Sequence, residues 1–325
     1  MVLEDGAGGV WAVAFHPDGQ HFFNGRGGSS GIRRWRVADG QELGKQIGTS
    51  VYAISVSKDE KWVVCGTSSG ASVWDAELRE KVAEVEGGNT VDAVDVTPDC
   101  TKFATGTDRR QVTIWSITMG EKLLGPLEHG GVVRGVRFST DGGRLATACY
   151  DDATIHIFDA HNGDQLISFM NPPGIPPNSL LPIAWSTHGQ QLFAVSSDYK
   201  IKSFDSSTGS LRAEWPIHES SDGPMSIALS ANGKFVASSA GRFVSFWDAL
   251  TLTQLGIVEE TDDIQTIALS PDGCRLATGS RASGPSIIQD LRGILPDSYL
   301  PGNVSTPIPI VNEDIHSRIF VSLHT

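Results

Sequence analysis

The feature that most constrains this chain is an internal repeat. A six-residue apolar alternation occurs seven times, and its copies begin at intervals of 41, 40, 42, 47, 44 and 40 residues. A period of this length fits one four-stranded unit with tight turns, and such units stack to bury a shared core. The copies are Val10–Phe15, Val51–Val56, Val91–Val96, Val133–Phe138, Leu180–Trp185, Pro224–Leu229 and Ile264–Leu269.

A tight turn follows each copy, as in Ser139-Thr-Asp-Gly142 and Ser270-Pro-Asp-Gly273. Proline presets an early turn position, aspartate can bond its own backbone, and glycine accepts positive φ, so each turn predicts a hairpin. A second strand rich in small residues follows, and a third ends in an aromatic residue and usually an acid. These endings are Trp74-Asp75, Phe158-Asp159, Phe204-Asp205 and Trp247-Asp248, with Trp35-Arg36, Trp115-Ser116 and Gln289-Asp290 as departures.

This succession resembles the WD-repeat family of β-propellers, whose repeat reads roughly V-x-x-V-x-F-S-P-D-G, then L-A-S/T-G, then I-x-x-W-D. The resemblance covers about residues 2–291. It implies an all-β fold, a seven-bladed propeller of four-stranded antiparallel blades around a central channel. In the family, the first strand of each repeat lines the channel and the fourth forms the rim.

The resemblance also implies a polar brace in each blade, in which a His, a Ser or Thr, an Asp and the Trp form a hydrogen-bonded set. The fourth repeat keeps His129, Thr147 and Asp152, but its aromatic residue is Phe158, which has no N–H to donate. No repeat has the full set. We therefore expect the blades to be held mainly by apolar stacking.

The two ends of the chain bear on how such a ring closes. We expect one propeller over residues 1–291 and an irregular C-terminal segment over 292–325, because this segment is rich in proline. Met1–Asp5 aligns with the tail of an outer strand, which leaves little sequence before the first repeat. The closing strand is expected from residues 292–325, at Ile308–Val311 or Arg318–Ser322, and the alternative is that upstream sequence is missing.

Composition excludes several classes of partner. Thirteen more acidic than basic residues give the 325-residue chain a net charge of −13, the wrong sign for binding nucleic acid phosphates. No apolar run is long enough to cross a membrane. Four widely spaced cysteines offer no metal pair and no disulfide framework, so we expect reduced thiols. We expect a monomeric propeller within a protein complex, in the cytoplasm, with the nucleus as an alternative.

Signatures of catalysis or cofactor binding are weak. The glycine-rich stretch Gly25–Gly31 falls at a predicted turn and opens no helix, so it is not a phosphate loop, and Gly40–Gln46 is expected to connect to the second blade. The nine histidines show no metal-binding spacing, and no nucleophile elbow is present. The sequence therefore predicts no catalytic residue, no cofactor and no metal.

The candidate binding residues follow from the resemblance. In the family, the residue after the first apolar position of the channel strand lies near the narrower top mouth, where partners dock. Aromatic residues, Met and Arg are favoured in interface cores. Docking and plugging of the channel both remain open for these side chains. The matching positions are Trp11, Tyr52, Asp92, Arg134, Leu181, Met225 and Gln265.

The sequence thus favours a non-catalytic scaffold that binds other proteins or peptides through its top face. One alternative is a sensor or receptor propeller within a larger signalling or ubiquitin-ligase-associated protein. Another is a propeller enzyme, a hydrolase or lyase, which would need acids or histidines from several blades at the channel mouth. Among the seven positions only Asp92 and Arg134 are charged.

Overall fold

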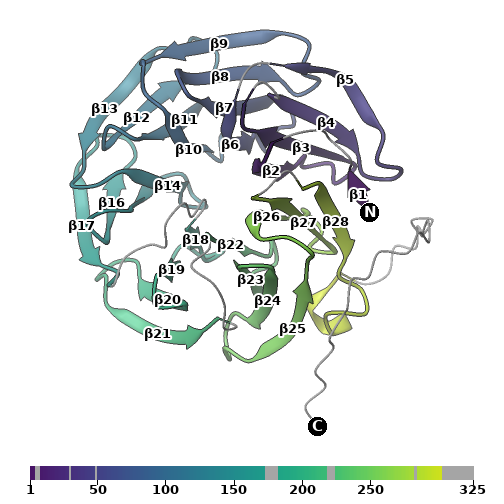
Figure 1. Cartoon of the computed structure of the whole chain (residues 1–325). Helices are drawn as coiled ribbons and strands as arrows, with labels where there is room; N and C mark the ends of the chain where they lie inside the picture. The colour runs from purple at the N-terminus through teal and green to yellow at the C-terminus, as the bar shows by residue number, and fades with distance from the viewer. Residues whose placement is uncertain are drawn as a thin grey trace.

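A computed structural model describes residues 1–3, 8–28, 31–47, 50–172, 182–217, 224–281 and 284–301. Seven antiparallel sheets of four strands are arranged in a ring (Figure 1), which confirms the predicted propeller. Among the described residues no helix is long and apolar enough to cross a membrane. The short turn η1 (Asp297–Tyr299) is the one helical element that the description contains.

Blades one to seven are numbered here by their inner strands, which surround the ring axis in Figure 1. The inner strands are β2 (Val10–Phe15), β6 (Val51–Val56), β10 (Val91–Val96), β14 (Val133–Phe138), β18 (Ile183–Trp185), β22 (Met225–Leu229) and β26 (Ile264–Leu269). The second strands are β3 (His21–Arg26), β7 (Trp62–Thr67), β11 (Lys102–Thr107), β15 (Arg144–Cys149), β19 (Gln191–Ser196), β23 (Phe235–Ala240) and β27 (Arg275–Ser280).

The remaining strands complete each blade outward. The third strands are β4 (Ile32–Arg36), β8 (Gly70–Asp75), β12 (Gln111–Ser116), β16 (Thr154–Asp159), β20 (Lys200–Asp205), β24 (Phe243–Asp248) and β28 (Ser286–Asp290). The fourth strands are β5 (Glu42–Ile47), β9 (Lys81–Glu86), β13 (Lys122–Glu128), β17 (Gln165–Met170), β21 (Leu211–Pro216), β25 (Gln254–Glu259) and β1 (Val2–Leu3).

Small residues in the second strands let neighbouring blades approach closely. A Cβ added to Gly106 would lie 2.7 Å from Cγ1 of Val133 in the next blade, and one added to Gly66 would lie 2.5 Å from the carbonyl oxygen of Val91. Larger side chains could not occupy these positions without moving a blade. The buried clusters accordingly span pairs of adjacent blades, which matches the expectation of apolar stacking.

The closing strand comes from the N-terminus, so the expectation that residues 292–325 supply it is corrected. Val2 pairs with Ile287 and Leu3 with Ser286, which makes β1 the fourth strand of blade seven. Leu3 is buried, and this apolar contact lets a very short strand hold its place. The earlier candidates Ile308–Val311 and Arg318–Ser322 lie outside the described residues.

Polar contacts reinforce the seam between blades one and seven. The fully buried Arg26 of β3 donates hydrogen bonds of 2.7 Å to the carbonyl oxygens of Gly8 and Gly284. Asn24 donates to the Ser286 hydroxyl at 2.8 Å. Hydrogen bonds to buried carbonyl groups satisfy backbone that would otherwise lose water without compensation.

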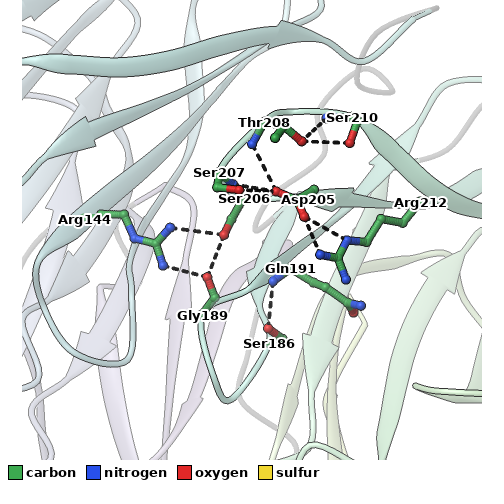
Figure 2. A network of polar contacts seen from close by, with 10 residues as sticks. All are labelled: Arg144, Ser186, Gly189, Gln191, Asp205, Ser206, Ser207, Thr208, Ser210 and Arg212. Atoms are coloured by element: carbon green, nitrogen blue, oxygen red, sulfur yellow. Dashed lines mark hydrogen bonds and ion pairs between the residues drawn. The ribbon is translucent and has the colours of Figure 1, made fainter.

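The acid that ends most third strands caps the turn to the fourth strand. Figure 2 shows this for Asp205, which accepts hydrogen bonds from the backbone N–H groups of Ser207 (2.9 Å) and Thr208 (3.0 Å) and contacts the Arg212 guanidinium. The Ser207 hydroxyl, which donates to Asp205 at 2.6 Å, together with Arg212 and the backbone donors holds the pKa of Asp205 well below its usual range. Arg144 of blade four reaches across to the Gly189 carbonyl oxygen in blade five at 2.6 Å (Figure 2).

The connection between blades one and two differs from the sequence expectation. Residues 42–46 of Gly40–Gln46, the stretch expected to be a connector, lie in β5, the rim strand of blade one, because a four-stranded blade needs that length of chain. After β28, Leu291 and Leu300 are buried against blades six and seven, and the Tyr299 hydroxyl donates to Asp248 at 2.5 Å. The described start of the C-terminal segment is therefore irregular but packed.

Candidate functional site

Most of the predicted top-face positions lie at β-bulges. The pairing between inner and second strands skips one residue in five blades, and the skipped residue is the predicted one. A bulge leaves one residue outside the ladder and re-aims its side chain. Met225 instead pairs regularly with Ala240, and Leu181 lies outside the described residues. The bulge residues are Trp11, Tyr52, Asp92, Arg134 and Gln265.

Trp11 and Tyr52 of adjacent blades form an aromatic pair. Their ring centroids lie 5.7 Å apart with an interplanar angle of 71°. This edge-to-face arrangement is an energetically favourable one for two aromatic rings. Both residues are partly exposed. A Cβ added to Gly27 would lie 2.7 Å from Nε1 of Trp11, so the indole rests directly on the backbone of the turn after β3. The pair is thus packed against the backbone at Gly27 and keeps part of its surface exposed.

Asp92 and Arg134 form the neighbouring pair in the ring. Nη1 of Arg134 lies 3.0 Å from Oδ1 of Asp92, and the carboxylate is buried while the guanidinium is partly exposed. Burial raises the pKa of Asp92 to about 6, although Arg134 opposes the shift. These two charged groups therefore satisfy each other across blades three and four.

The side chains at the two remaining described positions, Met225 and Gln265, are buried. Met225 is 0% exposed and Gln265 is 1% exposed, so neither side chain can touch a partner that docks on this face. Burial of these two side chains fits the plugging interpretation, whereas Trp11, Tyr52 and Arg134 retain exposed surface. The geometry divides the predicted set into partly exposed side chains on blades one, two and four and buried side chains on blades three, six and seven.

The structure also brings together side chains that the sequence did not connect. His129, Cys149 and His156 offer ligand atoms that all lie within 4.8 Å of one another. His129 Nε2 lies 2.8 Å from the Thr147 hydroxyl, as the family resemblance implied. Burial lowers the pKa of His129 to about 4 and also lowers that of His156. The resemblance places His129 beside Thr147 and the repeat register pairs Thr147 with His156, but neither indicates the approach of Cys149.

A second cluster, His16, Asp18 and His21, lies in the first hairpin. Asp18 Oδ2 lies 2.6 Å from His21 Nδ1, and Oδ1 accepts from the backbone N–H groups of Gln20 and His21. In other hairpins a Ser or Thr hydroxyl donates to the equivalent acid, as Ser57 does to Asp59 at 2.6 Å. His16, Asp18 and His21 therefore form a variant of the side-chain hydrogen bonding that stabilises the other hairpin turns.

Blade seven carries an unexpected acid at the position of His129. Both residues precede their inner strand by four positions, and Glu260 is 7% exposed. Its Oε1 accepts hydrogen bonds from Gln289 Nε2 at 2.6 Å and from the Thr278 hydroxyl at 3.3 Å. Burial raises the pKa of Glu260 to about 7. The sequence shows Gln289 as a departure from the repeat pattern, but it does not indicate Glu260 as the partner of this side chain.

Comparison with known proteins gives consistent results. The family model described as WD domain, G-beta repeat matches residues 2–36, 121–159 and 209–248. The chain is 24% identical over 71% of its length to Periodic tryptophan protein 2 of Arabidopsis thaliana, covering 25% of that protein. It is 25% identical over 52% of its length to Serine-threonine kinase receptor-associated protein of Dictyostelium discoideum, covering 55%.

A third relative is Guanine nucleotide-binding protein subunit beta of Zea mays, 30% identical over 39% of this chain and 37% of the relative. The chain thus spans between a quarter and about half of the length of these three relatives. The matched segments fall on blade one with β1, on blade four with its preceding rim strand, and on blade six with its preceding rim strand. The chain is thus a β-propeller of seven four-stranded blades that contains WD repeats in three regions.

Proposed function

We propose that this propeller is a non-catalytic scaffold that binds other proteins or peptides through its top face. The observation that carries the proposal is the partly exposed pair of Trp11 and Tyr52 at adjacent bulges. Aromatic side chains dominate the energetics of protein interfaces because they bury a large area with little loss of freedom. The accessible guanidinium of Arg134 adds a third residue type favoured in interface cores.

The scaffold acts by holding its binding side chains rigidly in place. The bulges are fixed by pairing on either side, and Trp11 rests on the backbone at Gly27. A partner therefore meets side chains that are already in place and loses less entropy on binding than it would on a mobile loop. The names of two relatives, a receptor-associated protein and a subunit, support a role within a complex.

The partner classes follow from charge. A net charge of −13 disfavours nucleic acid and anionic membrane surfaces, so the ligand of the top face is a protein or peptide. Asp92 and Arg134 form an ion pair at 3.0 Å. Neither group is therefore available to act as a separate acid or base on a substrate. We assign the scaffold to the cytoplasm, with the nucleus as the alternative, as a monomeric propeller within its complex.

The test is affinity capture from the native extract with the wild-type chain and with the double variant Trp11→Ala, Tyr52→Ala. We expect a partner that binds the wild type and binds the variant at least about tenfold more weakly, the scale of a hot-spot residue. The matched control is Met119→Ala, Leu250→Ala, which removes two exposed apolar side chains elsewhere, 66% and 89% exposed.

Two outcomes contradict the proposal. One is equal capture by the double variant and the wild type. The other is a loss of capture that accompanies a lower melting temperature and an altered far-UV circular dichroism spectrum, because the two rings would then act as a structural plug.

A further inference from the structure

Three potential metal ligands converge where the connection between blades three and four meets the second hairpin of blade four. His129 follows β13, Cys149 ends β15, and His156 lies in β16. Their ligand atoms lie within 4.8 Å of one another. Zinc bonds of about 2.0–2.3 Å in tetrahedral geometry require nitrogen and sulfur ligand atoms about 3.5 Å apart, so small side-chain movements suffice.

The outer nitrogens of both imidazoles already have acceptors. His129 Nδ1 lies 2.9 Å from the Leu127 carbonyl oxygen, and His156 Nδ1 lies 3.1 Å from Gln165 Oε1. These oxygens accept hydrogen bonds, so the ring hydrogens are placed on Nδ1 and the lone pairs on Nε2. A histidine that binds a metal through one nitrogen usually donates the other N–H to such an oxygen. The supporting contacts of a metal site are therefore in place.

His156 also has an unsatisfied atom. Its Nε2 is buried and has no hydrogen-bond partner, a costly condition for a polar atom away from water. The Nε2 of His129 is held by the Thr147 hydroxyl at 2.8 Å, a neutral hydrogen bond that a stronger ligand could replace. In this blade Phe158 stands where a Trp would donate, so the polar brace is incomplete.

The charges suit a divalent cation. Cys149 is buried, and burial followed by the Asp152 carboxylate raises the pKa of its thiol to about 12, while the backbone N–H of Gly131 opposes this shift. A bound cation is therefore needed to stabilise the thiolate. The negative charge of the Asp152 carboxylate acts to raise the pKa values of His129, His156 and the Cys149 thiol, because it favours the protonated form of each group. A thiolate and a nearby carboxylate together balance two positive charges, and nitrogen with sulfur donors favours zinc over calcium or magnesium.

We propose that His129 Nε2, Cys149 Sγ and His156 Nε2 bind one Zn²⁺ ion. Binding forms the zinc–sulfur bond and releases the thiol proton to solvent. The Thr147 hydroxyl gives up its hydrogen bond to His129 when the metal takes that lone pair. The ion pins the connection before blade four to the hairpin of that blade, and it replaces the brace that Phe158 cannot complete.

The experiment titrates the full chain, freed of metal by chelator dialysis, with Co²⁺ and then with Zn²⁺. We expect one equivalent of Co²⁺ to give thiolate-to-cobalt charge-transfer absorbance, and Zn²⁺ to displace it and raise the melting temperature. Cys149→Ser abolishes the charge-transfer band, and His156→Gln weakens binding at least about tenfold. Gln165→Leu, which removes the acceptor of His156 Nδ1, weakens it by about tenfold.

The matched controls are Cys274→Ser, another buried cysteine, and His161→Gln, an exposed histidine of the same blade. Both are expected to bind Co²⁺ as the wild type does. The absence of a charge-transfer band in the wild type overturns the proposal. So does a band that survives both Cys149→Ser and His156→Gln. If Cys149→Ser does not fold, His156→Gln decides alone, because His156 has no hydrogen bond at Nε2 to lose.

Discussion

Blades four and seven each place a buried side chain against the threonine of their second strand, but blade four uses a histidine and blade seven uses an acid. In blade four the Thr147 hydroxyl meets the imidazole of His129 at 2.8 Å. In blade seven the equivalent Thr278 hydroxyl meets the carboxyl group of Glu260 at 3.3 Å. The aromatic position differs too, because blade four has Phe158 and blade seven has Gln289, which donates to Glu260 at 2.6 Å.

The difference shows that this position requires a buried hydrogen-bond acceptor more than a histidine. Burial favours the neutral form in both blades, so it lowers the pKa of His129 to about 4 and raises that of Glu260 to about 7. Around neutral pH the imidazole is uncharged, whereas the acid is near its midpoint. The two blades should therefore respond differently to mutation and to pH.

The largest effect is expected from Glu260→Ala. This change leaves Gln289 Nε2 and the Thr278 hydroxyl buried without their shared acceptor. Unsatisfied buried groups cost about 1–3 kcal/mol each, so we expect a loss of about 4 kcal/mol in the free energy of unfolding, measured by urea denaturation. The control Glu259→Ala removes a half-exposed ion pair with Arg242 and should cost less than about 1 kcal/mol. Equal losses in the two variants would contradict the role of Glu260.

A somewhat smaller effect concerns pH and uses Glu260→Gln, which keeps an acceptor oxygen and removes the ionisable group. The pKa of Glu260 rises from 4.5 to about 7 on folding. Between these values the unfolded chain ionises while the folded chain keeps its proton, so the wild type loses stability as pH rises. The loss should be roughly 2–3 kcal/mol between pH 4.5 and 7.5.

The variant should lack this loss, so the difference in unfolding free energy between variant and wild type should grow with pH across that window. Urea denaturation at several pH values measures it. A difference that stays constant would show that Glu260 has the same affinity for protons in both states, and one that shrinks as pH rises would show that folding lowers its pKa.

The smallest effect sharpens the comparison from the side of blade four. Phe158→Trp supplies the missing indole N–H, as Trp115 does when it donates to the Thr105 hydroxyl at 2.9 Å in blade three. One added hydrogen bond should stabilise the protein by about 1 kcal/mol in urea denaturation. The gain should vanish when Thr147→Val removes the acceptor, and a gain that persists in the double variant would mean that indole packing alone is responsible.

Much of the fold could be predicted because the repeat pattern and the structural unit coincide. The alternation at Val10–Phe15 predicts β2 residue for residue, since one face of an inner strand must be buried. The alignment of Met1–Asp5 with the tail of an outer strand indicated the closing strand, but Val2–Leu3 is too short to carry any periodicity, so closure was assigned to residues 292–325 instead. The rim strand Glu42–Ile47 was missed for a related reason, since strands at the rim mix polar and apolar residues.

The candidate sites were less predictable. Matching to the family selected Trp11 and Tyr52, which occupy equivalent bulge positions in adjacent blades. The burial of Met225 and Gln265 depends on how neighbouring blades fill space. The meeting of His129 with Cys149 and His156 joins residues from two blade units and a hairpin, so no spacing in the sequence signals it. Such convergence is a tertiary property that a linear motif does not contain.

The pairing of β1 with β28 has a consequence for the order of folding. The Met1 amino group donates to the Ile288 carbonyl oxygen, 287 positions along the chain. At a synthesis rate of about 5–20 residues per second, the first residues wait roughly 15–60 s before their partner emerges. The first six blades use contacts that are local in sequence and can form meanwhile, whereas blade seven has to wait. Closure of the ring therefore follows the synthesis of β28, and a nascent chain that ends before this strand is an open arc.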